Sequence, residues 1–348
     1  MSENAYKESG VNIDEGNRFV ALIKNIAGST HNKSVIHGIG GFAGLYALDK
    51  FRGMKDPVLV SSADGVGTKL KVAIEANVYN TVGIDLVAMS LNDIVVTGAR
   101  PLIFLDYIAT GSLSADKMAL VLEGIAAGCR EAETALLGGE TAEMPGMYAD
   151  GDFDLAGFAV GIVERDKIID GSGIKEGDCL VGLASSGFHS NGYSLLRKVF
   201  FKDSGFGPDD CIKGYGKVSE MLLTPTRIYV KAVMAALAAE IPVKGMVHIT
   251  GGGFYDNIPR VLPDGTAVVL DKRAFPKIPA FDALRSVSSI PERELHRVFN
   301  MGIGFIFILS QSDTEPLLKV AAEMGETAHV IGTVVRGGKN VSIRGIDV

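Results

Sequence analysis

The chain has 348 residues, enough for two average domains, and its 47% hydrophobic and 22% charged residues are typical of a soluble globular protein. A net charge of −7 and the lack of any long basic run argue against a nucleic-acid surface. No stretch of about 18 uncharged apolar residues predicts a membrane span, and the first residues lack a secretory signal, so we expect a cytoplasmic protein. The three cysteines are widely spaced and odd in number, which argues against a disulfide framework or a zinc site.

Apolar periodicity predicts helices and strands along the first half of the chain. They are a helix over residues 16–27, a strand over 58–62, helices over 68–77 and 83–97, a strand over 101–109, a helix over 115–133, and strands over 135–137 and 153–163. Asn12 or Asp14 could cap the first helix, and the residues before about 56 are otherwise expected to be irregular. A charged segment with several glycines follows residue 163, which places a domain boundary near residue 170.

The second half repeats the alternation of strands and helices. Strands are predicted over residues 179–184, 246–249, 266–270, 303–309 and 329–335, and helices over 191–200, 227–239, 254–261 and 314–324. This alternation indicates an α/β architecture, with α+β character in each half. We therefore expect an amino-terminal domain over residues 1–170 and a carboxy-terminal α/β domain over 171–348 that completes the substrate site.

A short segment between the strand at 58–62 and the following helix has the residues that a nucleotide phosphate and its magnesium need. It contains Asp64, Gly65, Gly67, Thr68 and Lys69. Glycines let the backbone approach a phosphate, the first amides of a helix point at it, and a lysine neutralises it. The segment is not a P-loop, because its order ends Thr-Lys and the loop is too short.

Two further acids lie beside small or polar residues at the ends of predicted elements. Asp93 follows Asn92 in an otherwise apolar helix, and Glu140 follows Gly139 after a short buried strand. Any one of these acids could be a helix cap or a surface ion pair. Asp64, Asp93 and Glu140 together, with Lys69 nearby, fit magnesium that is held through oxygen ligands and substrate phosphates.

The second half offers two loops with histidine, hydroxyl or amide side chains and glycine. His189, Ser190 and Asn191 follow the strand at 179–184, and His248 precedes a triple glycine. Spare amides at such turns can receive an anion, although a capping loop with an incidental histidine is the competing interpretation. Nothing in the chain resembles a Ser or Cys nucleophile motif.

These motifs occur in a fixed order over almost the whole chain, from Tyr6 to near Val335. They are Asp64-Gly-Val-Gly-Thr-Lys69, Asn92-Asp93 through Gly98-Ala99-Arg100-Pro101, Gly138-Gly139-Glu140-Thr-Ala-Glu143-Met-Pro-Gly146, Ser185-Ser-Gly187-Phe-His189-Ser-Asn191-Gly192, His248-Ile-Thr-Gly251-Gly252-Gly253 and Asn300-Met-Gly302-Ile-Gly304. The ordered set resembles the phosphoribosylformylglycinamidine cyclo-ligases, or aminoimidazole ribonucleotide synthetases, of purine biosynthesis.

The resemblance implies a homodimer whose amino-terminal domains pair through their sheets, and an ATP-dependent closure of an imidazole ring on formylglycinamidine ribonucleotide. It implies that ATP and Mg²⁺ are bound by residues of the amino-terminal motifs, namely Asp64, Gly65, Gly67, Thr68, Lys69, Asn92, Asp93, Gly98, Gly139 and Glu140. Asp64, Asp93 and Glu140 would be the metal ligands. The second substrate would face Ser190, Asn191, Gly251, Gly252 and Gly253, with His189, Lys69 and His248 as catalytic candidates.

One residue departs from the family pattern, and related families remain as alternatives. Asn12 stands where the family usually has Asp, so a charge-dependent role there is in doubt while a capping role would survive. The same architecture serves the synthetase one step earlier, thiamine-monophosphate kinase, selenophosphate synthetase and a hydrogenase maturation protein. An inactive nucleotide-binding or scaffold protein is a further alternative, which the joint presence of Asp64, Lys69, Asp93 and Glu140 disfavours.

Overall fold

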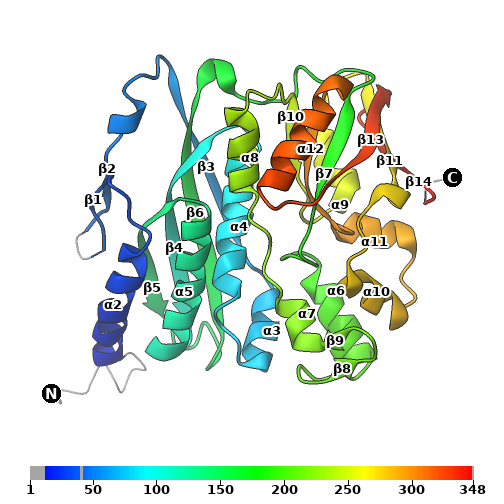
Figure 1. The fold of residues 1–348 in the computed structure, drawn as a ribbon. Helices are drawn as coiled ribbons and strands as arrows, with labels where there is room; N and C mark the ends of the chain where they lie inside the picture. Colours follow the sequence, from blue (N-terminus) through cyan, green and yellow to red (C-terminus); the bar gives the residue numbers. More distant parts are fainter. Residues whose placement is uncertain (1–11, 40–41, 347–348) are drawn as a thin grey trace. The chain divides into compact units, whose positions relative to one another are not determined.

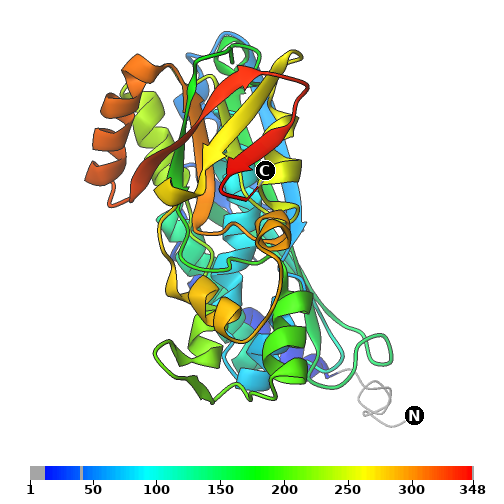
Figure 2. The same ribbon diagram turned by 90° about the vertical axis from the view of Figure 1, so that its right-hand side faces the viewer.

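A computed structural model describes residues 12–39 and 42–346 of the chain (Figures 1 and 2). The chain divides into two compact units. Unit 1 holds the residues up to Ile94 together with Pro101–Glu164, and unit 2 holds Val95–Arg100 and the residues from Arg165 onward. The start of the family resemblance, residues 6–11, lies outside the described residues.

Unit 1 is built on a four-stranded sheet with the strand order β3-β6-β4-β5. Its elements are α2 (Ile13–Gly28), β1 (Val35–His37), β2 (Leu45–Tyr46), β3 (Pro57–Gly65), α3 (Lys69–Ala76), α4 (Val82–Val95), β4 (Arg100–Thr110), α5 (Ala115–Glu131), β5 (Ala135–Glu143) and β6 (Phe153–Glu164), with a 3-10 turn at Asp49–Phe51. Strands β3 and β6 are antiparallel, whereas β4 and β5 are parallel.

Helices cover one face of this sheet, and their close packing explains several glycines. A Cβ atom added at Gly157 of β6 would lie 2.5 Å from Phe104 and 3.1 Å from Leu86 of α4. Helices α4 and α5 touch backbone to backbone, because a Cβ atom at Gly83 would lie 2.2 Å from the Val121 carbonyl oxygen. These positions must therefore remain glycine for the helices to pack at this distance.

The other face of the sheet presents apolar side chains to solvent. Leu59 of β3 is 66% exposed and Phe158 of β6 is 45% exposed. Register pairs Ser61 with Val160 and Ala63 with Phe158, so these residues share one face with Leu59. This face of the unit 1 sheet therefore leaves large apolar side chains exposed.

Unit 2 is built on a six-stranded sheet with the strand order β10-β12-β7-β13-β11-β14. Its elements are a 3-10 turn at Arg165–Lys167, β7 (Cys179–Ala184), α6 (Tyr193–Arg197), a π-helical turn at Lys198–Asp203, β8 (Cys211–Ile212), β9 (Gly216–Lys217), α7 (Val218–Leu223), α8 (Val230–Ala238), β10 (Gly245–His248), α9 (Gly253–Asn257), η4 (Ile258–Arg260), β11 (Thr266–Asp271), η5 (Lys272–Ala274), α10 (Pro279–Ser286), α11 (Glu292–Val298), β12 (Ile303–Leu309), η6 (Gln311–Asp313), α12 (Thr314–Glu323), β13 (Ala328–Arg336) and β14 (Val341–Arg344). The pairs within this sheet are antiparallel except β11–β14, which is parallel.

The predicted α/β class is confirmed, and most predicted elements lie within a few residues of the observed ones. The strand predicted over 135–137 instead continues to Glu143, because β4 provides a ladder as far as the Thr110–Glu143 pair. The helix predicted over 191–200 is interrupted by the π-helical turn that begins at Lys198. Several short elements were not predicted, namely α7, α10, α11, β8, β9 and β14 of unit 2. The expectation that the residues before about 56 are irregular outside the first helix was wrong, because β1 and β2 pair there as a short antiparallel ladder. Such short segments are fixed by their pairing and packing and have no strong local pattern.

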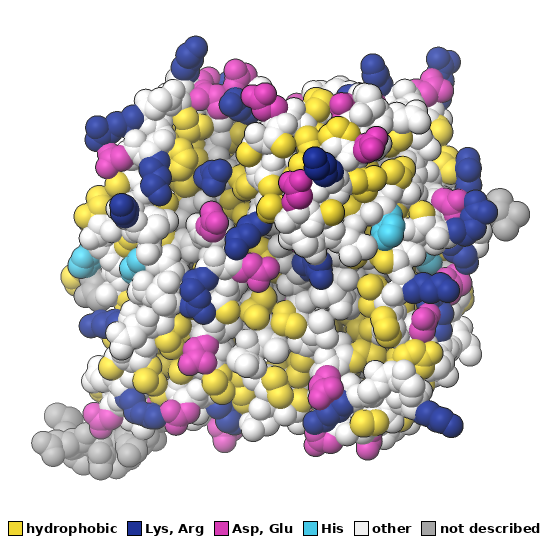
Figure 3. Space-filling model, viewed as in Figure 1, with side chains coloured by type: hydrophobic (Ala, Val, Ile, Leu, Met, Phe, Trp, Pro, Cys, Tyr) yellow, Lys and Arg dark blue, Asp and Glu magenta, His cyan; other side chains and the backbone are white. Residues whose placement is uncertain are grey.

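Two further observations concern the charges on the surface and the length of the helices among the described residues. On the face shown in Figure 3, acidic and basic side chains are interspersed, and the coloured residues form no broad patch of one charge. None of the helices within residues 12–39 and 42–346 is long and apolar enough to span a bilayer.

Candidate functional site

In unit 1 the predicted nucleotide motif lies where β3 ends and α3 begins. Asp64 is half-buried near the end of β3, and one of its carboxylate oxygens accepts a hydrogen bond of 2.7 Å from the Gly65 amide. Gly67 has φ +70°, a left-handed conformation that favours glycine. Gly67 and Thr68 are exposed, so this turn is open to a ligand.

Lys69 is placed differently from the simple expectation of a lysine facing a phosphate. Its side chain is fully buried, and its Nζ lies 2.9 Å from Asp85 on α4. Burial lowers the pKa of Lys69, and the charge of Asp85 opposes that shift. The ammonium therefore joins α3 to α4 in the interior of unit 1.

The three predicted metal ligands are spread across unit 1. Asp64 lies on β3 and Glu140 on β5, the two edge strands, so two strands separate them and the distance across the sheet is about 14 Å. Asp93 lies near the end of α4 and is half-buried. Within the described residues, no three His, Cys, Asp or Glu side chains form a group that could hold a metal ion. A single magnesium held by all three acids of one chain is therefore not what this geometry provides.

A cavity of about 400 Å³ in unit 1 contains an acid that the sequence analysis missed. Asp106 of β4 lines this cavity together with Gly139 and Glu140 of β5. Burial raises the pKa of the Asp106 carboxyl to about 7, with a smaller contribution from the negative charge of Glu140. A Cβ atom at Gly139 would lie 2.3 Å from the Asp106 carboxylate, so glycine at 139 makes room for this acid. The parallel pairing of β4 with β5, invisible in the sequence, brings these groups together.

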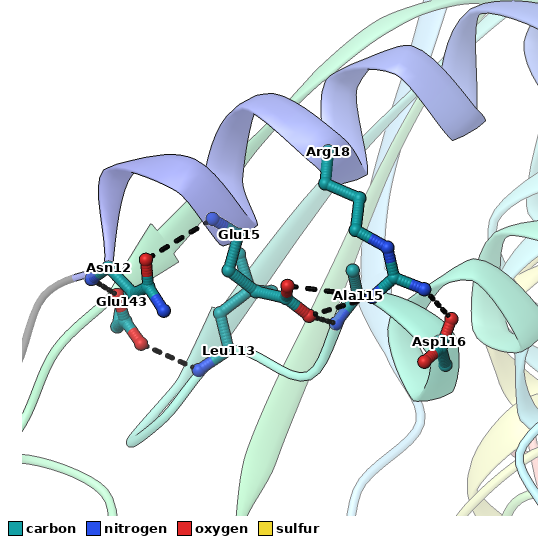
Figure 4. A network of polar contacts seen from close by, with 7 residues as sticks. All are labelled: Asn12, Glu15, Arg18, Leu113, Ala115, Asp116 and Glu143. Carbon is teal, nitrogen blue, oxygen red and sulfur yellow. Dashed lines mark hydrogen bonds and ion pairs between the residues drawn. The ribbon is translucent and has the colours of Figure 1, made fainter.

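Helix α2 forms part of the same cavity and is fixed to the sheet by polar contacts (Figure 4). The Asn12 side chain accepts a hydrogen bond of 3.3 Å from the Glu15 amide, so the predicted cap is confirmed. The Asn12 amide donates to one oxygen of Glu143 at 2.9 Å, and the Leu113 amide donates to the other at 2.7 Å. The Glu15 carboxylate in turn accepts from the Ala115 amide at 2.8 Å. Glu143 thus joins the start of α2 to the loop after β4.

The same network continues along the exposed side of α2. Arg18 forms ion pairs with Glu15, at 3.2 Å, and with Asp116 at the start of α5 (Figure 4). Arg18 and Asp116 are exposed to solvent, so the contribution of their ion pair to stability is small. They orient α2 along α5 and thereby close one side of the cavity.

In unit 2, three predicted turns meet at one edge of the sheet. Strands β7 and β10 end, and β12 begins, at this edge, because β12 lies between the other two and is antiparallel to both. The Ser185 amide donates to the Gly302 carbonyl at 2.8 Å, and the Ile249 amide donates to the Gly304 carbonyl at 2.9 Å. The Asn300 side chain donates to the Gly187 carbonyl at 2.9 Å. The order of the strands therefore brings together motifs that lie far apart in the chain.

The predicted substrate residues lie in these turns. A Cβ atom at Gly251 would lie 3.4 Å from the Asn191 side-chain oxygen, so the two loops touch. The Ser190 hydroxyl lies 2.9 Å from the Thr226 hydroxyl. Asn257, which the sequence analysis missed, donates to the carbonyls of Gly251 and Gly253 at 3.1 and 2.8 Å. Asn257 therefore holds the triple-glycine turn in shape.

The two histidine candidates are both buried. His189 is 1% exposed, has φ +62°, and accepts a hydrogen bond of 3.2 Å from the Ser186 amide at its Nε2. A Cβ atom at Gly304 would lie 2.5 Å from the His189 ring and 2.1 Å from the Tyr229 hydroxyl, which explains that glycine. His248 is 6% exposed at the end of β10. The buried His189 ring thus helps to hold the conformation of the 185–189 loop through its contact with the Ser186 amide.

Comparison with known proteins agrees with this architecture. Residues 43–163 match the family model of the AIR synthase related protein, N-terminal domain, and residues 175–344 match its C-terminal domain. Among solved structures, a thiamine-monophosphate kinase from Stenotrophomonas maltophilia K279a has a TM-score of 0.67 at 19% identity, over 94% of this chain and 97% of that one. A hydrogenase maturation protein in complex with ATP has a TM-score of 0.65 at 17% identity, over 93% and 90%. These structures share the fold, and the chain is an AIR synthase related protein.

Relatives with higher sequence identity show to which family of AIR synthase related proteins the chain belongs. A phosphoribosylformylglycinamidine cyclo-ligase of Caldanaerobacter subterraneus subsp. tengcongensis is 53% identical over 95% of this chain and 98% of its own length. Cyclo-ligases of Thermoanaerobacter pseudethanolicus and Oleidesulfovibrio alaskensis are 54% and 53% identical, each over 95% of this chain and over 97% and 94% of their own lengths. The chain therefore belongs to the phosphoribosylformylglycinamidine cyclo-ligase family, the ligases that close the imidazole ring in purine biosynthesis.

Proposed function

We propose that this chain uses ATP to convert formylglycinamidine ribonucleotide into 5-aminoimidazole ribonucleotide, with release of ADP and phosphate. The observation that carries the proposal is the meeting of three turns in unit 2, in a chain about half identical to named cyclo-ligases. The turns supply amides, hydroxyls and an asparagine, which suit a sugar phosphate, and unit 1 supplies acids for a metal–nucleotide complex.

The reaction requires activation of the formamide oxygen and does not require a nucleophilic side chain from the enzyme. The formamide oxygen is a poor leaving group, so transfer of the ATP γ-phosphoryl group to that oxygen makes it leave as phosphate. The neighbouring amidine nitrogen then attacks the same carbon and loses a proton, which closes the ring. The protein must hold the two substrates in line and stabilise the charge on the moving phosphoryl group.

We assign the metal–nucleotide role to Asp64, Asp93 and Glu140. Magnesium usually binds one or two carboxylates and completes its shell with water and phosphate oxygens, so acids that lie apart fit separate ions on one nucleotide better than a shared cage. When bound, magnesium would neutralise charge on the phosphates. Gly65, Gly67, Thr68, Asn92, Gly98 and Gly139 would shape the binding surface. Lys69 would act through its ion pair with Asp85, as a positioning residue for α3.

We assign the ribonucleotide to the turns of unit 2. Ser190, Asn191 and the amides of Gly251, Gly252 and Gly253 would bind its phosphate and ribose. Because the Nε2 of His189 already accepts a backbone hydrogen bond, a proton-carrying role would fall to its Nδ1 or to His248.

An assay of ADP release tests the proposal directly. With ATP, Mg²⁺ and formylglycinamidine ribonucleotide we expect ADP and a product that gives the colour reaction of a diazotised aromatic amine. Thiamine monophosphate is the matched control substrate, because a kinase for it has the same fold. ADP release with thiamine monophosphate, and none with the ribonucleotide, would overturn the proposal.

A substitution of Asn191 tests whether the ribonucleotide binds at the turns of unit 2. Asn191→Ala should raise KM for the ribonucleotide at least tenfold while leaving KM for ATP within twofold. Asn25→Ala, at an exposed position of α2, is the matched control. If Asn191→Ala left both KM values unchanged, the ribonucleotide would not bind at this turn.

We also propose a cytoplasmic homodimer that pairs through the exposed sheet face of unit 1. Leu59 and Phe158 would be covered in such a pair. The thiols of Cys129, Cys179 and Cys211 are free, which fits a reducing compartment. Leu59→Glu should convert a dimer into monomers in sedimentation experiments, whereas Leu120→Glu, at an exposed position of α5, should not. A wild-type monomer at micromolar concentration would refute the dimer.

A further inference from the structure

Unit 2 contains a cavity of about 500 Å³ between η5, α10 and α11 that is lined by neither the 187–191 loop nor the triple glycine. Its charged lining is mainly basic. The charged residues are Lys272, Arg273, Lys277, Arg285, Asp282 and Glu292. This makes the cavity a basic pocket in a chain whose net charge is −7.

The two acids of the cavity share one arginine. Arg285 lies 2.6 Å from Glu292 and 3.1 Å from Asp282, and it holds the pKa of Glu292 below its usual value. Arg273 is likewise paired with Asp271, at 2.6 Å. Lys272 and Lys277 form no ion pair with any part of the chain that the structure describes. The two lysines therefore outweigh the one acidic charge that Arg285 does not offset, and their ammonium groups are available to an anion.

The floor of the same cavity is apolar and partly aromatic. Phe275, Ile278, Phe281 and Met301 line it. The Phe275 ring lies 6.0 Å from the ring of His296, which is 2% exposed and also lines the cavity. Flat apolar walls beside a few converging charges are typical of small-molecule sites, and the volume is within the range of such sites.

We propose that this cavity binds an organic phosphate of the size of a nucleoside monophosphate. Lys272 and Lys277 hold the phosphate, and the flat part of the ligand lies against Phe275 and Phe281. Arg285 pairs with Glu292 and Asp282 and offsets one of their two negative charges, so that the cavity keeps a net positive charge. The ligand is distinct from the ATP and ribonucleotide assigned above, because the residues assigned to them do not line this cavity.

The cavity is positioned to act on the turns of unit 2. A Cβ atom at Gly253 would lie 2.1 Å from the His296 carbonyl oxygen, so the end of α11 packs directly on the triple glycine. A Cβ atom at Gly302 would lie 2.6 Å from the Pro276 carbonyl oxygen, so the 275–278 segment packs on the turn that holds Asn300. A ligand that fixes α11 and this segment should therefore change the affinity of the turns. This coupling rests on the proposed function, whereas binding to the cavity does not.

Isothermal titration of the full chain with GMP tests the binding. The protein is first saturated with Mg²⁺ and a non-hydrolysable ATP analogue, so that GMP cannot enter the nucleotide site. We expect submillimolar binding by the wild type and at least tenfold weaker binding by Lys272→Gln/Lys277→Gln. Neither lysine forms an ion pair, so the double variant should keep the wild-type Tm. Lys231→Gln, an exposed lysine on α8, is the matched control and should bind like the wild type.

The result that overturns the proposal is the absence of GMP binding by the wild type, or equal binding by the double variant. Inorganic phosphate that binds as tightly as GMP would overturn the role of the aromatic floor. The coupling is tested separately, by measuring KM for the ribonucleotide with and without GMP. Binding that leaves KM unchanged would refute the coupling alone, and a failure of the cyclo-ligase assay itself would leave the binding result intact.

Discussion

Replacing Lys69 with methionine separates a structural role of its ammonium from a role at a bound phosphate. The structure buries the side chains of both Lys69 and Asp85 completely, with 2.9 Å between the ammonium and the carboxylate. Lys69→Met leaves the Asp85 carboxylate without this partner in a site that water does not reach. Breaking a buried ion pair in this way costs about 3–5 kcal/mol of the free energy of unfolding.

Two further variants serve as controls for this loss of stability. Lys71→Met breaks the ion pair with Asp152, whose partners are 44% and 27% exposed, so we expect a loss below about 1 kcal/mol. Lys69→Met/Asp85→Leu removes both charges, and a well-packed apolar pair should return the free energy of unfolding to near the wild-type value.

The assay combines urea unfolding with hydrogen exchange of peptides from α3 and α4, because a chain of two units need not unfold in one step. Exchange should rise in both helices of Lys69→Met and return toward wild type in the double variant. The ADP-release assay is run on the same proteins. If Lys69→Met lost less than about 1 kcal/mol of stability and still abolished ADP release, the structural interpretation would be refuted.

Three further predictions follow from single residues. Asp106 has a folded pKa of about 7 against an ordinary value of 3.8, so between pH 4 and 7 the folded state binds a proton that the unfolded state lacks. Stability should therefore fall by up to about 4 kcal/mol as pH rises through this range, and Asp106→Asn should remove that fall, as measured by urea midpoints in EDTA at pH 5 and 8. A pH slope unchanged in the variant would contradict the assignment. Gly139→Ala should destabilise unit 1, because the added Cβ atom would collide with the Asp106 carboxylate. A wild-type Tm of this variant would show that the carboxylate can move away. Asn12→Ala should cost about 1 kcal/mol through loss of the α2 cap, whereas Asn12→Asp should keep it; equal hydrogen exchange of α2 in both variants would count against the cap.

Much of the fold can be predicted from this sequence because its elements have strong local signals. The buried run of β12 and the amphipathic pattern of α5 mark a strand and a helix without any tertiary information. Residue type and position narrow the cap of the first helix to Asn12 or Asp14, and the structure selects Asn12. The apolar patterns of α10 and α11 are too short to identify a helix from the sequence alone.

The sequence by itself determined the residue types of the sites and their order, which were enough to indicate the family. Strand order decided which of those residues meet, since it separates Asp64 from Glu140 by two strands and joins the turns at Gly187, Gly251 and Gly302 at one edge. Burial decided what the charges do, because a lysine beside glycines could face a phosphate or pair with an acid on another helix. Both outcomes depend on contacts between distant segments, which no local pattern encodes.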